Sequence, residues 1–168
     1  KSAQFLMVRS KDDGLTWFKP ENPTRQLKKE AWWLFTPSPQ QGIQLADGTL
    51  VMPSQGRDEK GKEFSTIMTS RDHGATWTVA PSAYSGGSEC QAVLPGDGAL
   101  MFNMRIEQGR FRAVFTTRDF GRTWEPHPTN GNTLIEPNCN GSLLRVDYEA
   151  AGEKKHVLLF ANPHTQKG

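Results

Sequence analysis

The sequence is poor in cysteine, and its two cysteines show none of the usual spacing signals. Cys90 and Cys139 stand 49 positions apart, with no Cys-x-x-Cys pair and no histidine at metal-ligand spacing beside them. Free cysteine is among the residue types most often buried, so we expect two ordinary buried thiols. A disulfide and a metal site stay open as alternatives, and no residue is assigned as a metal ligand.

Long apolar runs and blocks of like charge are also missing. No run approaches the roughly 18 apolar residues that a membrane span requires, so no span is predicted. The 20 Lys and Arg residues nearly balance the 18 Asp and Glu residues, for a net charge of +2, and they are scattered along the chain. Nucleic acids and acidic membranes are bound by concentrated positive charge, so neither is an expected partner.

Helical signals are scarce, whereas turn residues are abundant. The 168 residues include 16 Gly and 11 Pro, which favour many turns over long helices. The segment 26–30 is long enough for one helical turn at most. The length suits a single domain, and we expect an all-β fold.

The pattern [Ser/Thr]-x-Asp-x-Gly-x-Thr-Trp occurs three times, at residues 10–17, 70–77 and 117–124. Its aspartate accepts hydrogen bonds from nearby backbone N–H groups, which closes a tight loop, and its glycine supplies a positive φ. Its indole can bury a large area between neighbouring sheets. We therefore interpret these aspartates as turn-builders rather than acids or metal ligands. The residues concerned are Asp12, Gly14, Trp17, Asp72, Gly74, Trp77, Asp119, Gly121 and Trp124.

A second repeat precedes two of the octads. Segments 42–51 and 91–101 each read as strand, Asp-Gly turn, strand, and Asp-Gly is a strong hairpin signal. Together with the octad hairpin, the unit has four strands in about 50 residues, the size of a propeller blade. The chain then holds two complete blades with parts of others on both sides. Because a propeller must close to protect its sheet edges, we expect residues 1–168 to be a segment of a longer domain.

The octads resemble the Asp boxes of sialidases (neuraminidases), exo-acting glycoside hydrolases built on a six-bladed β-propeller. Three other segments resemble sialidase sequences between the boxes: 36–45, with its Gly-Ile-Gln-Leu run; 88–93, followed by 103–105; and 136–142, with its Pro-x-Cys-x-Gly-Ser pattern. The resemblance is closest to bacterial sialidases. It implies a partial six-bladed propeller of about three blades, built from antiparallel four-stranded sheets with Asp-box hairpins. Residues 1–168 would be the central segment of the catalytic domain.

The resemblance also implies a mechanism and two site residues. Sialidases use a tyrosine nucleophile, and a glutamate helps to remove its proton; by motif that glutamate is Glu89. Three arginines clamp the substrate carboxylate, and Arg105 matches one of them. The resemblance places one arginine and the acid/base aspartate before this chain, and the third arginine and the tyrosine after it. Tyr84 and Tyr148 fit neither the position nor the motif of the nucleophile. The 168-residue chain alone is expected to be inactive.

Simpler interpretations stand beside these assignments. Glu89 could form a structural salt bridge at a strand end, and Arg105 could be a solvated charge. Gln55 and Arg57 end an inner strand and are candidates for the rim of a substrate pocket.

The implied partners are sialylated glycans, with no cofactor. The resemblance implies a secreted, periplasmic or cell-surface protein, although no signal peptide lies within these residues. The rival hypothesis is a non-catalytic Asp-box propeller that binds glycan or protein.

Overall fold

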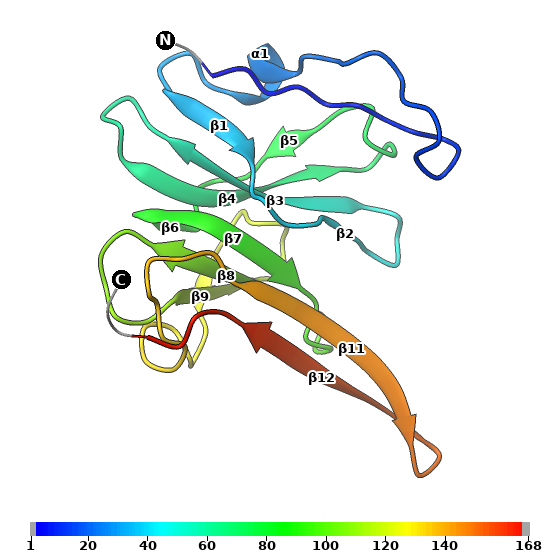
Figure 1. The fold of residues 1–168 in the computed structure, drawn as a ribbon, viewed down its shortest axis with the longest axis vertical. Coiled ribbons are helices and arrows are strands. Elements are labelled where there is room, and N and C mark those ends of the chain that lie inside the picture. The colour runs from blue at the N-terminus through cyan, green and yellow to red at the C-terminus, as the bar shows by residue number, and fades with distance from the viewer. Residues whose placement is uncertain (1–2, 166–168) are drawn as a thin grey trace.

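Antiparallel sheets follow one another along the chain and lie side by side in space (Figure 1). The structure is a computed structural model and describes residues 3–165. The single helical turn α1 (Thr24–Leu27) lies close to the segment where the sequence allowed one. In the described part of the chain, no helix is both long and apolar enough to cross a membrane. The architecture is therefore all-β, as the abundance of turn residues predicted.

The first complete sheet follows an N-terminal hairpin that is held by one bridge between Met7 and Glu21. The first edge strand of this sheet is split in two, because β1 and β2 both pair with β3 and residues 38–42 loop out between β1 and β2. Strand β3 pairs with β4, and β4 pairs with the short strands β5 and β6. The bounds are β1 Leu34–Pro37, β2 Ile43–Gln44, β3 Leu50–Arg57, β4 Glu63–Ser70, β5 Thr78–Val79 and β6 Tyr84–Ser85.

The second complete sheet has the order β10-β9-β8-β7, so consecutive strands are neighbours. A two-stranded hairpin, β11 with β12, follows it beyond the loop 127–141. The bounds are β7 Gly87–Val93, β8 Leu100–Ile106, β9 Ala113–Thr117, β10 Glu125–Pro126, β11 Ser142–Ala150 and β12 Glu153–Ala161. The described residues therefore contain two complete sheets with a partial unit on each side, as predicted from the repeats. The first sheet has six strands rather than four, because two short strands pair with β3 and two with β4 on their outer sides.

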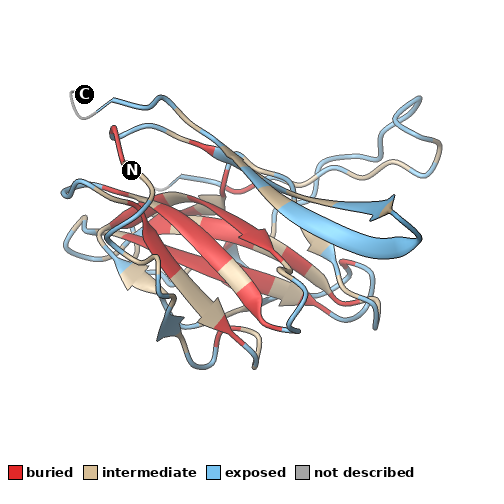
Figure 2. Cartoon of the chain, turned by 90° about the horizontal axis from the view of Figure 1, so that it is seen from below, coloured by how far each residue is buried: buried red, intermediate tan, exposed pale blue. Residues whose placement is uncertain are grey.

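Two apolar clusters join the sheets. The larger one lies between the two complete sheets and includes Ile67 of β4 and Phe102 of β8, both fully buried. The smaller one joins Phe5 of the N-terminal segment to Phe35 and Met68 of the first sheet. Each such side chain contributes about 1.5–3 kcal/mol on burial, so the sheet-to-sheet contacts hold the stack together. Figure 2 shows the buried residues concentrated in the two complete sheets, whereas the β11–β12 hairpin is mostly exposed.

Each Asp box closes the hairpin between the third and fourth strands of its unit. In the second box, Asp72 accepts hydrogen bonds from the backbone N–H (2.8 Å) and the hydroxyl (2.6 Å) of Thr76. The Ser70 hydroxyl donates to Asp72 and accepts from the N–H of Gly74, both at 2.8 Å. The other two boxes repeat all four contacts. The hydrogen bonds from threonine lower the pKa of all three aspartates to about 2.

The tryptophans of the three boxes differ in exposure. Trp77 packs against the cluster that contains Phe5, and the indole N–H of Trp124 donates to the carbonyl of Pro81 at 3.3 Å. The indole of Trp124 therefore contacts the preceding unit, whereas that of Trp77 packs on the cluster shared by its own sheet and the N-terminal segment and donates to the carbonyl of Gly74 at 3.1 Å. Trp17 belongs to the N-terminal unit, which no described unit precedes, and its side chain is 60% exposed. The expectation of a buried indole is therefore wrong for the first box.

Candidate functional site

Four charged side chains lie at the end of the two complete sheets opposite the Asp boxes. Arg57 ends β3 and Glu63 begins β4, while Glu89 lies near the start of β7 and Arg105 near the end of β8. Because antiparallel strands alternate in direction, these four positions share one end of the stack. The sheet topology therefore gathers at one rim residues that are as much as 48 positions apart in the chain.

A β-bulge at the start of β7 places Glu89. The regular pairing of β7 with β8 shifts between Gly87 and Cys90, so that Ser88 and Glu89 together lie opposite Arg105. A bulge bends its strand and redirects a side chain, and bulges are common beside functional sites. Residues on either side of Glu89 are buried, whereas its own side chain is 24% exposed. The bulge thus allows a charged side chain at the entry to an apolar strand.

Glu89 and Arg105 form an ion pair. Nη1 of Arg105 donates to Oε2 of Glu89 at 2.7 Å, and the two side chains are 28% and 24% exposed. Partial burial by itself would lower the pKa of Arg105, but the hydrogen bond and charge of Glu89 outweigh it and raise that pKa above its ordinary value. The pair therefore presents a fixed cation and a carboxylate, both reachable from solvent. Together they can bind an anionic group and accept a proton.

Asn138 holds the other side of the Arg105 guanidinium. Its Oδ1 accepts hydrogen bonds from Nε of Arg105 at 3.2 Å and from Nη2 at 2.9 Å. Asn138 lies in the loop before β11 and has a positive φ of 57°. All three nitrogens of Arg105 therefore have a protein partner, and two separate elements orient the side chain.

The structure places Arg57 and Gln55 on β3, beside this cluster. Nη2 of Arg57 donates to Oε1 of Glu63 at 2.5 Å, across the β3–β4 pair. The Glu63 charge also acts on Arg105, which links the two ion pairs electrostatically. Gln55 lies opposite Thr36 of β1 and is partly buried. Their roles at a pocket rim stay predictions.

A third ion pair, which is fully buried, lies close to Arg105, and the sequence did not predict it. Nη1 of Arg112 donates to Oε2 of Glu136 at 2.9 Å, and the side chains are 0% and 1% exposed. Nε of Arg112 also donates to Oδ1 of Asn103 on β8. Arg112 stands between Phe111 and the apolar residues that begin β9. A full charge inside an apolar run, as at Glu89, is the signal in the sequence that could have revealed it.

The two cysteines have different environments. Cys90 is fully buried in β7, and burial raises the pKa of its thiol to about 12. Cys139 is exposed, which corrects the expectation of a second buried thiol, and neither cysteine is in a disulfide. The loop uses the backbone of Cys139 instead, since its N–H donates to Glu136 (3.1 Å) and its carbonyl accepts from Arg112 (3.1 Å).

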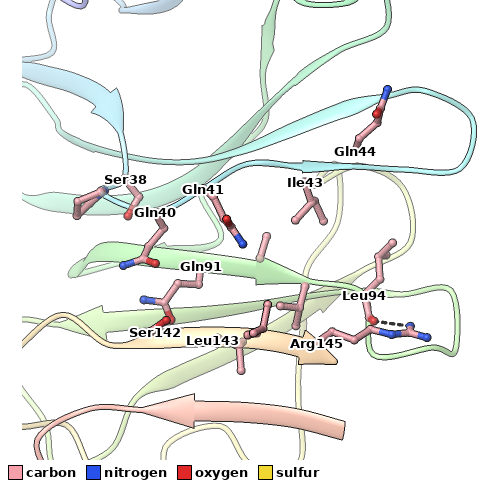
Figure 3. Close-up of a pocket in the computed structure, with 14 residues that line it drawn as sticks. Ser38, Gln40, Gln41, Ile43, Gln44, Gln91, Leu94, Ser142, Leu143 and Arg145 are labelled. Atoms are coloured by element: carbon pink, nitrogen blue, oxygen red, sulfur yellow. Dashed lines mark hydrogen bonds between the residues drawn. The ribbon is translucent and has the colours of Figure 1, made fainter. Parts of the chain in front are cut away.

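A cavity of about 650 Å³ lies along the inner strands, away from the Glu89–Arg105 pair. It is bounded by β2, β7 and β11, and Figure 3 shows Gln41 and Ile43 pointing into the space between β2 and β7. Arg145 of β11 donates to the Leu94 carbonyl at 2.8 Å, which ties two units together across it. Its lining is mostly amide and apolar, with two serine hydroxyls and Arg145 but no carboxylate.

Neither tyrosine of the chain lies in the charged cluster. Tyr84 packs against Phe115, with ring centroids 5.9 Å apart, and Tyr148 is exposed on β11. Within residues 3–165, no group of three or more His, Cys, Asp or Glu side chains is arranged to hold a metal ion. The chemistry available at the rim is therefore that of a carboxylate and a guanidinium.

Comparison with known proteins identifies the family. The family model described as BNR repeat-like domain matches residues 1–168. A sialidase of Bacteroides fragilis is 38% identical over 99% of this chain, and the chain covers 31% of that protein. The solved Hadza microbial sialidase Hz136 is 42% identical with a TM-score of 0.90, over 97% of this chain and 32% of that one.

A more distant structure shares the same fold. The Trypanosoma rangeli sialidase, solved in complex with sialic acid, is 27% identical with a TM-score of 0.72, over 92% of this chain and 26% of that one. The chain thus spans about a third of the length of the first relatives it matches. Its sheets correspond to part of a sialidase β-propeller, which confirms the predicted fold class. The chain belongs to the family of BNR repeat-like domains, and the proteins it is similar to are sialidases.

Proposed function

We propose that residues 1–168 form the central segment of the catalytic propeller of an exo-sialidase. The parent protein would hydrolyse terminal α-ketosidically linked sialic acids from glycoconjugates. The observation that carries this proposal is the ion pair of Glu89 and Arg105 at 2.7 Å, partly exposed at the rim of two adjacent sheets. The sialic acid bound to the Trypanosoma rangeli relative supports the choice of substrate class.

The two residues take different parts in the reaction. Sialic acid carries a carboxylate beside its anomeric carbon, and a guanidinium matches a carboxylate in shape and stays charged. Arg105 would therefore bind the substrate carboxylate. Glu89 would accept the proton of a tyrosine nucleophile supplied from outside this chain, because tyrosine, with an ordinary pKa of about 10, is mostly protonated at neutral pH.

The geometry of the pair suits both parts. The bulge keeps Glu89 out of the apolar core, and Arg105 is held in place without being sealed from solvent. A tyrosine attacks the anomeric carbon more easily than a carboxylate would, since it brings no full negative charge toward the substrate anion. We also propose, from the relatives, that the parent protein acts outside the cytoplasm on sialylated glycoproteins, glycolipids or oligosaccharides.

Hydrolysis of a fluorogenic sialoside by the full-length protein tests this proposal. Glu89→Gln should lower kcat by orders of magnitude while the protein stays folded, because it removes the base and keeps the shape. Glu107→Gln is the matched control, since Glu107 is an exposed glutamate just beyond β8. A near-normal kcat for Glu89→Gln would remove Glu89 from the reaction.

Arg105→Ala tests the clamp. It should chiefly raise KM, and Arg118→Ala is its control, because Arg118 is exposed and paired with Asp97 at the other end of the sheet. Unchanged KM and kcat in Arg105→Ala would exclude it from carboxylate binding. If the wild-type protein binds sialosides without hydrolysing them, the rival function, a glycan-binding propeller, replaces the enzyme.

A further inference from the structure

We propose that Asn138, supported by the buried Arg112–Glu136 pair, positions Arg105 so that two of its N–H groups are left for a substrate carboxylate. This inference rests on the proposed function, because it concerns how the same site recognises its substrate. It assigns a positioning role to three residues that lie outside the reacting pair.

The hydrogen bonds of Arg105 define which donors remain. A guanidinium has five N–H groups. Oδ1 of Asn138 takes one from Nε and one from Nη2, and Oε2 of Glu89 takes one from Nη1. The two N–H groups left over are one on each Nη atom. A carboxylate binds best to two such donors in parallel. With Glu89 on the Nη1 hydrogen that points away from Nη2, the two remaining N–H groups form such a pair, and this is the arrangement that we propose.

The loop that carries Asn138 is held from behind by the buried pair. Oε1 of Glu136 accepts from the N–H of Cys139 at 3.1 Å, and Nη1 of Arg112 donates to the carbonyl of Cys139 at 3.1 Å. Both backbone groups of the residue after Asn138 are thus bound. Asn138 itself has a φ of 57°, in the left-handed region that asparagine adopts more readily than most residues. The buried pair acts on the residue that follows it, by binding both backbone groups of Cys139.

The same pair also reaches the strand that carries Arg105. Nε of Arg112 donates to Asn103, which is 1% exposed and lies two residues before Arg105 on β8. The pair therefore connects the Asn138 loop with β8, the two elements whose separation decides whether Asn138 meets Arg105. A purely stabilising role is the alternative, and apolar residues of similar volume fill that role as well or better.

Asn138→Gly in the full-length protein is the cleanest test. Glycine tolerates the positive φ, so the substitution removes the acceptor and keeps the backbone. Hydrogen bonds to a charged group are among the stronger ones, so we expect KM for a fluorogenic sialoside to rise about tenfold. Arg105 binds the substrate carboxylate equally in the ground state and in the transition state, so kcat should stay within about twofold of the wild-type value. Asn132→Gly, at an exposed asparagine of the same loop, is the control and should leave KM unchanged.

A binding measurement separates positioning from general damage. Free sialic acid carries the carboxylate, whereas its methyl ester lacks the charge. Asn138→Gly should weaken the binding of the acid about tenfold and leave the binding of the ester unchanged. Equal losses for acid and ester, or an unchanged KM, would overturn the inference.

Glu136→Gln extends the test to the buried pair. If Glu136 acts through Asn138, then adding Glu136→Gln to Asn138→Gly raises KM by less than the product of the two single effects. If the increases in KM from the two single variants simply multiply in the double variant, the proposed action of the Arg112–Glu136 pair through the Asn138 loop is overturned. If Glu136→Gln does not fold, Asn138→Gly still decides the role of Asn138.

The outcomes distinguish this inference from the proposed function. A wild-type protein that neither binds nor hydrolyses sialosides overturns both. An active wild type that is impaired by Arg105→Ala but unaffected by Asn138→Gly overturns the positioning inference alone.

Discussion

Replacing Glu136 with glutamine would leave the Arg112 guanidinium in a dry environment without a carboxylate partner. The two side chains are 0% and 1% exposed, so neither can turn toward water. Burial lowers the pKa of Arg112 and raises that of Glu136, and in both cases it outweighs the attraction of the partner. Each charge is therefore compensated in the buried site by the other, together with hydrogen bonds to Asn103 and to the backbone of Cys139.

The expected loss of stability follows from that balance. Removing one member of a buried ion pair costs about 3–5 kcal/mol, because the other charge is left uncompensated. The glutamine oxygen can still accept one hydrogen bond, either from Arg112 or from the N–H of Cys139. We therefore expect Glu136→Gln to lower the free energy of unfolding by about 3 kcal/mol, at the lower end of that range.

Urea unfolding of the full-length protein, followed by tryptophan fluorescence, measures the change through the midpoint at constant m-value. Glu149→Gln is the control, because Glu149 is exposed on β11 and should change stability by less than about 0.5 kcal/mol. In Arg112→Met/Glu136→Gln no unpaired charge remains, so the double variant should be more stable than Glu136→Gln, by at least about 1 kcal/mol. If Glu136→Gln behaves like Glu149→Gln, the description of a dry, mutually dependent pair is wrong.

Two further predictions concern the thiols and the Asp boxes. Cys90 is buried and its pKa is raised to about 12, whereas Cys139 is exposed. When the native protein is treated with a thiol reagent, Cys139→Ser should therefore abolish fast labelling within this segment, and Cys90→Ser should leave it unchanged. Fast labelling of Cys90 would contradict this prediction. Asp72 has its pKa lowered from 3.8 to about 2 in the folded state, so its stabilising effect is present above pH 3.8 and is lost as the pH falls toward 2. In urea titrations, Asp72→Asn should therefore be less stable than the wild type at pH 7. Its stability should also fall less than that of the wild type between pH 4 and pH 2. If the stabilities of the two proteins fall in parallel with pH, the role of Asp72 in the turn is refuted.

The fold could be predicted because its signals are local. An Asp box draws its hydrogen bonds from within eight residues, as the contacts of Asp72 with Ser70 and Thr76 show. The sequence pattern therefore contains the whole turn. Asp-Gly turns at residues 47–48 and 97–98 specify the other hairpins in the same way. With both turns known, the order of strands in a unit follows.

The site could be predicted only in part, because its contacts are not local. Glu89 and Arg105 were found through a family motif, and the bulge that brings them together has no mark in the sequence. Arg112 and Glu136 are 24 positions apart and belong to different elements. Their pairing depends on how the loop before β11 folds back on β9, and Asn138 owes its place to the same loop.

The bulge at Ser88 and Glu89 also affects which mutations this segment can accept. A substitution at Glu89 changes one side chain and leaves the pairing of β7 with β8 intact. Deleting one residue there would remove the extra position, and every residue on one side of the gap would have to slip by one. Since neighbouring residues of a strand face opposite sides, such a slip would exchange Gln91 and Ala92 between the two faces of the sheet. The segment can therefore accept substitutions but not changes in length, so the charge at position 89 can be lost or altered in evolution while the spacing around it must stay constant.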